Sequence, residues 1–117
     1  TSLFDFGDDG GLAITGGSAS GLTIGASGTK IIQSRSYSSS LTPASIVANT
    51  SAEQTFTVTG LSTDDRVFVN GPTPTAGTGI VNVRVSATNT IAITWMNSTV
   101  GPLTPTAGTY AIVAIRH

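Results

Sequence analysis

One six-residue pattern, Thr-Pro-Thr-Ala-Gly-Thr, occurs twice in the chain, at residues 73–78 and again 31 positions later at residues 104–109. Proline has no amide N–H for a β-ladder and fixes its own backbone angle, whereas glycine adopts angles that other residues avoid. Runs rich in β-branched residues follow both copies, at residues 79–85 and 110–116. Each copy is therefore predicted to be a turn that leads into a β-strand.

Apolar and polar residues alternate with the period of two that is typical of half-buried strands. In residues 53–59 this pattern turns Phe56 and Val58 inward, and in residues 90–96 it places Ile91, Ile93 and Trp95 on one face. Strands are expected at residues 31–37, 45–48, 53–59, 66–70, 79–85, 90–96 and 110–116, with a break at 38–40 and with Val81, Val83 and Val85 on one face. No segment shows a capped helical period. The pattern predicts an all-β fold, a single antiparallel β-sandwich of immunoglobulin-like or jelly-roll topology.

The last expected strand is apolar on both of its faces. Tyr110, Ile112 and Ala114 alternate with Ala111, Val113 and Ile115. A small sandwich needs to cover only the inner face of each sheet, so the second face requires another partner. Either the N-terminal segment or another subunit would cover it. We therefore expect a homo-oligomer, with Val113 and Ile115 as candidate interface residues.

The first eleven residues combine aromatic and acidic side chains and contain three of the six acids of the chain. They could form a calcium site, but their spacing matches no complete calcium-binding loop. They could also be a mobile acidic tail, or an arm whose aromatic rings enter pockets of a neighbouring subunit while its carboxylates meet basic groups. The candidate interface residues of such an arm are Phe4, Asp5, Phe6, Asp8 and Asp9.

Residues 16–28 are rich in glycine and serine, and their only large apolar residues are Leu22 and Ile24. This composition suits a flexible connector, or an extended segment laid across a neighbour with these two residues as anchors. The segment lacks the Gly-Lys-Ser/Thr of a phosphate-binding loop. We therefore divide the chain into an extended arm, residues 1–29, and a β-sandwich domain, residues 30–117.

The overall composition favours contact with other proteins. Only 9% of the residues are charged and the net charge is -1, so neither nucleic acid nor a membrane surface is an expected partner. No apolar run approaches the roughly 20 residues that span a bilayer. Cysteine is absent, while serine and threonine make up 34 of the 117 residues. A surface rich in hydroxyl groups has a low free energy of desolvation when another protein packs against it. This composition therefore suits a component of an assembly.

The residue types of common active sites are scarce. The single histidine, His117, is the last residue, and the adjacent pair Asp64 and Asp65 is interpreted as a solvated turn rather than a catalytic pair. We expect no catalytic residues, no cofactor, no metal and no enzymatic activity.

Two further pairs of side chains leave alternatives open. Trp95 and Tyr110 could stack on a sugar ring, but their apolar strands favour positions in the core. Arg84 and Arg35 could bridge subunits through acidic partners, or they could simply be solvated.

From residue 30 to residue 116, about three quarters of the chain, the sequence resembles small virion proteins of tailed bacteriophages that decorate the head or form head fibres. The resemblance lies in residues 41–65 (LTPASIVANTSAEQTFTVTGLSTDD), 77–97 (GTGIVNVRVSATNTIAITWMN) and 103–116 (LTPTAGTYAIVAIR). It implies a β-sandwich, often trimeric, that binds the major capsid protein at subunit junctions on the capsid exterior and stabilises the shell as a cement protein. The same module also resembles pieces of phage tail proteins, so binding to a host-surface glycan or protein is the alternative.

Overall fold

The computed structural model describes residues 4–6, 12–14 and 27–117. The strands are β1 (Phe4–Phe6), β2 (Leu12–Ile14), β3 (Gln33–Leu41), β4 (Thr50–Thr57), β5 (Asp65–Asn70), β6 (Thr78–Ala87), β7 (Thr90–Asn97) and β8 (Gly108–Arg116). The described residues include no helix, and hence none that is long and apolar enough to cross a membrane. The predicted all-β class is confirmed.

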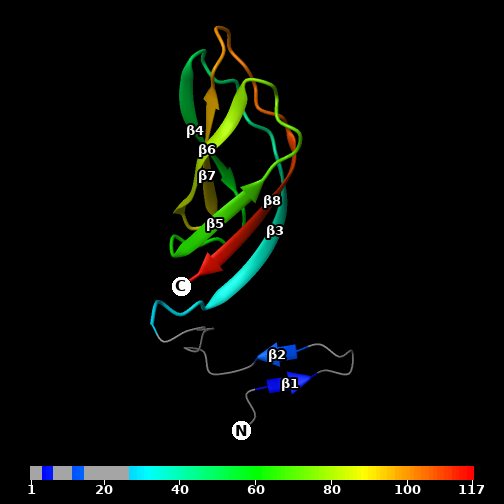
Figure 1. Cartoon of the computed structure of the whole chain (residues 1–117), viewed down its shortest axis with the longest axis vertical. Coiled ribbons are helices and arrows are strands. Elements are labelled where there is room, and N and C mark those ends of the chain that lie inside the picture. Colours follow the sequence, from blue (N-terminus) through cyan, green and yellow to red (C-terminus); the bar gives the residue numbers. More distant parts are fainter. Residues whose placement is uncertain (1–3, 7–11, 15–26) are drawn as a thin grey trace.

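Six of these strands form two antiparallel sheets, ordered β3-β8-β5 and β4-β7-β6 (Figure 1). The chain passes between the two sheets after β3, β4, β5 and β7, so among these six strands only β6 and β7 are consecutive strands of the same sheet. The two central strands, β7 and β8, carry the most continuous apolar sequence. The predicted antiparallel β-sandwich is confirmed.

The core lies between the two sheets and is centred on Trp95, whose side chain is only 2% exposed. The indole ring packs edge-to-face against Phe56 and Tyr110, at centroid distances of 5.9 and 6.2 Å. Ile91, Ile93 and Ile112 are fully buried around it. The expectation that the alternating strands turn these residues inward is correct.

The two copies of Thr-Pro-Thr-Ala-Gly-Thr contact each other at one end of the sandwich. The hydroxyls of Thr75 and Thr106, which occupy equivalent positions in the two copies, lie 3.1 Å apart. Thr75 Oγ1 also donates a hydrogen bond of 3.0 Å to the carbonyl oxygen of Thr104.

In the first copy, Gly77 has a positive φ of 91° and its carbonyl accepts a hydrogen bond from the amide of Ser98. The predicted turn is confirmed for the first copy, where the Thr78 amide donates to the Thr75 carbonyl oxygen at 3.0 Å. It is wrong for the second copy, where residues 104–107 form no turn and Gly108 already begins β8.

Gly77→Ala is expected to lower the free energy of unfolding by about 2 kcal/mol. A Cβ at Gly77 would lie 2.5 Å from Thr99 Cγ2, and the positive φ adds a backbone cost. Urea denaturation measures the change. Gly28→Ala is a control for the backbone cost alone, because Gly28 also has a positive φ but has no atom within 4 Å of its Cβ position. Equal losses in the two variants would contradict the predicted clash.

Two of the strand predictions are wrong. Residues 38–40 do not break the first strand, because Ser38, Ser39 and Ser40 continue β3 and pair with β8. Residues 45–48 do not form a strand; Ile46 makes only an isolated bridge to Leu103. Ladder hydrogen bonds to the apolar strand β8 outweigh the weak strand preference of three serines, since tertiary pairing decides strand position more than local propensity.

The predicted face of Val81 is also wrong. A β-bulge shifts the register of β6 between Ile80 and Asn82, so that Val81 has no partner on β7 and is 52% exposed. Val83 and Val85 remain on the inner side, opposite Ile93 and Ile91. An extra residue in one strand reverses the alternation locally, which is why the uninterrupted alternation expected for this strand failed here.

Candidate interaction surface

The outer surface of the β3-β8-β5 sheet faces away from the core and forms what we call the outer β8 face. Cross-strand register defines its three rows, each with one residue from β3, β8 and β5 in that order: Ser34, Ile115 and Arg66; Ser36, Val113 and Phe68; Ser38, Ala111 and Asn70. The β3 side is therefore a line of serines, the centre is aliphatic, and the β5 side has an aromatic residue between two polar ones.

This face exposes apolar side chains. Phe68 is 61% exposed, and Val113 beside it is half-buried. Ile32, 50% exposed, lies next to β3 and donates its amide to the Arg116 carbonyl oxygen at 2.7 Å. The structure places Val113 and Ile115 opposite the core-facing residues of β8, as the alternation predicted. Their role in an interface remains a prediction.

The outer surface of the β4-β7-β6 sheet has a different chemistry, dominated by hydroxyls and one ion pair. Arg84 on β6 reaches across β7 to Glu53 on β4 with two hydrogen bonds of 2.7 and 2.8 Å. These bonds lower the pKa of Glu53 and raise that of Arg84. Ala92, which lies on β7 between the two strands, is fully buried, whereas Met96 is 45% exposed. Arg84 thus has an acidic partner within its own chain, which disfavours the alternative that it bridges subunits.

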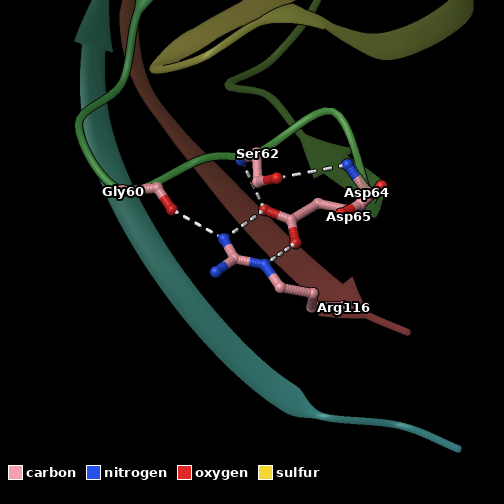
Figure 2. Close-up of polar contacts among 5 residues, drawn as sticks. All are labelled: Gly60, Ser62, Asp64, Asp65 and Arg116. Atoms are coloured by element: carbon pink, nitrogen blue, oxygen red, sulfur yellow. Dashed lines mark hydrogen bonds and ion pairs between the residues drawn. The ribbon is translucent and has the colours of Figure 1, made fainter.

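An ion pair between the buried carboxylate of Asp65 and the partly exposed Arg116 lies at the opposite end of the sandwich from the repeated sequences. Figure 2 shows its contacts. Asp65, 5% exposed, accepts hydrogen bonds from Arg116 Nε at 2.7 Å and from Arg116 Nη2 at 3.1 Å. Arg116 Nη2 also donates to the Gly60 carbonyl oxygen, and the Ser62 amide donates to Asp65 Oδ2. Hydrogen bonding to Arg116 holds the pKa of Asp65 below its ordinary value. The prediction of a solvated turn is therefore wrong for Asp65.

This network has a structural role. Both carboxylate oxygens of Asp65 already accept hydrogen bonds, and the guanidinium of Arg116 joins the end of β8 to the loop that precedes β5. Asp65 and Arg116 are cross-strand partners, so only the pairing of β5 with β8 reveals their contact. Within residues 27–117 there is no cluster of three or more histidine or acidic side chains that could hold a metal ion.

A recess of about 300 Å³ lies between the two repeated sequences, and Pro72, Pro74 and Pro105 line it. Trp95 and Tyr110 also border this recess, but each side chain is only 2% exposed, and the Tyr110 hydroxyl donates to the Thr106 carbonyl oxygen at 2.7 Å. A buried indole cannot present its face to a sugar ring. The alternative that Trp95 stacks on a glycan is therefore disfavoured, whereas the preference for a core position is correct.

The described part of the N-terminal arm consists of β1 and β2, which pair as a two-stranded antiparallel sheet. The register places Phe4 opposite Ile14 and Phe6 opposite Leu12, with Asp5 between the two aromatic residues. The other candidate residues of the arm lie outside the described residues. These are Asp8, Asp9, Leu22 and Ile24.

Comparison with known proteins yields no match: no family model, no curated protein and no solved structure matches this chain.

Proposed function

We propose that this chain is a structural protein of a phage virion, which decorates the capsid and stabilises it by packing against other protein subunits. The observation that supports this most directly is the outer β8 face, where Phe68 is 61% exposed on the same face as the half-buried Val113 and Ile115. Exposed apolar patches of this kind are typical of protein interaction sites. The oligomeric state, partner and location in this proposal come from the resemblance to small virion proteins. They are a homotrimer that binds the major capsid protein on the capsid exterior.

The chemistry of the outer β8 face suits repeated protein contacts. Serine and alanine around the apolar centre have little side-chain entropy to lose, and a serine hydroxyl costs less to desolvate than a charged group. One such contact is modest in strength, but copies of an oligomer that bind an ordered shell at several points act together. Function by contact alone requires no catalytic residue, cofactor or metal.

Phe68→Ser is expected to weaken self-association and retention on capsids by about tenfold or more, because a large aromatic side chain at the centre of an interface contributes strongly to binding. Folding should be unchanged, since Phe68 is 61% exposed. Sedimentation velocity and co-pelleting with particles that lack the protein measure the two effects.

Met96→Ser is the matched control for this variant. Met96 is also an exposed apolar residue, at 45%, but it lies on β7 in the other sheet. Equal effects of the two substitutions, or none from Phe68→Ser, would contradict the assignment of the outer β8 face as the binding surface.

A second candidate function is binding to a glycan or protein of the host surface. The recess between the repeated sequences favours it, because a hollow lined by proline rings and threonine can hold a small ligand. A glycan array probed with the whole protein tests this candidate. Binding that survives Phe68→Ser would assign recognition to the recess rather than to the outer β8 face.

A further inference from the structure

The sandwich has four edge strands, β3 and β5 in one sheet and β4 and β6 in the other. The outer side of an edge strand carries backbone N–H and C=O groups without a partner strand, so it can pair with a strand of another chain. Proteins usually block such edges with bulges, with short strands or with a covering segment. The four edges of this sandwich differ in how well they are blocked.

Three of the edges are obstructed. Two register shifts interrupt the pairing of β6 with β7, and shifts of this kind bend an edge away from a straight partner. The Gln54 side chain of β4 hydrogen-bonds both the N–H and the C=O of Ala44, at 2.7 and 2.9 Å, and so holds the preceding segment beside this strand. β5 has only six residues, and residues of both β5 and β6 line a hollow between the two strands.

The edge of β3 has none of these obstructions within residues 27–117. All nine of its residues, Gln33–Leu41, pair with β8 in one uninterrupted register. The strand contains no proline, and five of the nine residues are serines, whose small side chains let another backbone come close. Serine has a weak intrinsic preference for strands, so a second ladder would stabilise β3.

The sequence of β3 also complements itself in the antiparallel direction. The register that pairs all nine residues with a second copy is centred on Tyr37 and sets serine opposite serine along the outer side of the sheet. These pairs are Ser34 with Ser40 and Ser36 with Ser38. Hydroxyl groups at directly opposite positions can hydrogen-bond to each other. Arg35, the one charged residue of β3, lies opposite Ser39, whereas a register centred on Arg35 would bring like charges together.

We propose that β3 pairs with β3 of a second copy, antiparallel and in the register centred on Tyr37. The two three-stranded sheets then form one six-stranded sheet, in the order β5-β8-β3-β3-β8-β5. Both copies contribute the same strand, so the contact is two-fold. It uses an edge and leaves the outer β8 face open, and it places the outer β8 faces of two copies side by side. Between trimers of the proposed function, this contact links copies of neighbouring trimers.

Introduced cysteines test this pairing, because the natural chain contains none. Full-length chains carrying Ser34→Cys are mixed with chains carrying Ser40→Cys, re-equilibrated and treated with a short bismaleimide linker. The proposed register sets these two positions opposite each other, with Cβ atoms about 5 Å apart. Two Ser34→Cys positions would instead lie about 20 Å apart along the strands, beyond the reach of a short linker.

Mass spectrometry of the covalent dimer is expected to show the mixed link between positions 34 and 40. Its yield should exceed that of the control mixture about tenfold, because pairing raises the local concentration of the two thiols. In the control, Asn70→Cys replaces Ser40→Cys. Asn70 is exposed on the same face of the same sheet but lies on β5, at the other edge, so only background cross-linking is expected there.

A charge exchange gives a second readout of the register. Ser36→Lys combined with Ser38→Lys should weaken the two-fold contact about tenfold, because lysine then faces lysine across the two copies. Ser36→Glu combined with Ser38→Lys should preserve the contact, because each carboxylate then faces an ammonium group. Both positions are exposed, so neither variant should change folding. Sedimentation velocity compares the two in a Phe68→Ser chain, in which association through the outer β8 face is weakened.

Every outcome supports or overturns the edge pairing. A mixed link no stronger than the Asn70→Cys control would overturn it, as would equal association of the two charge variants. Links between two Ser34→Cys chains without the mixed link would show a different packing and overturn it too. Retention on capsids tests the proposed function separately. A chain that forms the mixed link but is not retained would overturn the proposed function alone, and a chain that is retained without the link would overturn the edge pairing alone.

Discussion

Trp95→Ala is expected to lower the free energy of unfolding by about 4 kcal/mol, the typical cost of truncating a large aromatic side chain in a core. Trp95 is 2% exposed and makes edge-to-face contacts with Phe56 and Tyr110, so its removal leaves a cavity between the sheets and takes away two aromatic pairs. A domain of this size is usually stable by only about 5–15 kcal/mol, so the loss is a large fraction of the total.

Urea denaturation followed by far-UV circular dichroism measures the effect of Trp95→Ala. Trp95→Phe is the matched control, and it should cost less because it retains an aromatic ring in the same site. The outcome that would contradict a structural role is a variant of nearly unchanged stability that loses only binding to a glycan, since that would make the indole a recognition surface.

Arg116→Met is expected to lower the free energy of unfolding by about 3 kcal/mol at neutral pH, because it leaves the buried carboxylate of Asp65 without its cationic partner. The side chain of Asp65 is only 2% exposed, and its carboxylate accepts two hydrogen bonds from Arg116. Arg66→Met on the same sheet is the control for loss of a positive charge, and it should change stability little because Arg66 is exposed.

The pH dependence of the Arg116→Met effect has a definite sign. In the natural chain the pKa of Asp65 lies below its ordinary value of 3.8, so the stabilisation is present above that pH and is lost as the pH falls through the lower folded value. Without Arg116, burial should instead raise the pKa of Asp65, and protonation should relieve the penalty in acid. The difference in unfolding free energy between the natural chain and Arg116→Met should therefore become smaller as the pH falls from neutral to about 3. A difference that stays constant over this range would show that the ion pair is not its cause.

Features that depend on side-chain periodicity could be predicted from the sequence. The strands at 53–59, 66–70, 90–96 and 110–116 were located to within a few residues, because alternation is a local property and each run ends at a turn-forming residue. The same alternation placed Trp95 inside and Val113 on the opposite face from the core. The composition also indicated a chain whose surface is hydroxylated rather than charged.

The contacts between distant residues could not be predicted in this way. Asp65 and Arg116 are 51 positions apart, and Thr75 and Thr106 are 31 apart, so each contact depends on which strands or turns become neighbours. Likewise, the bulge at Val81 and the continuation of β3 through three serines follow from pairing with β7 and β8.

The sequence by itself determined the approximate positions of most strands and which of their side chains turn inward, because steric alternation acts over two or three residues. Only the tertiary structure decided which strands pair, and therefore that Phe68 lies exposed beside Val113. Register is set by many weak hydrogen bonds and packing contacts along the whole sheet. It therefore cannot be predicted from any one short segment.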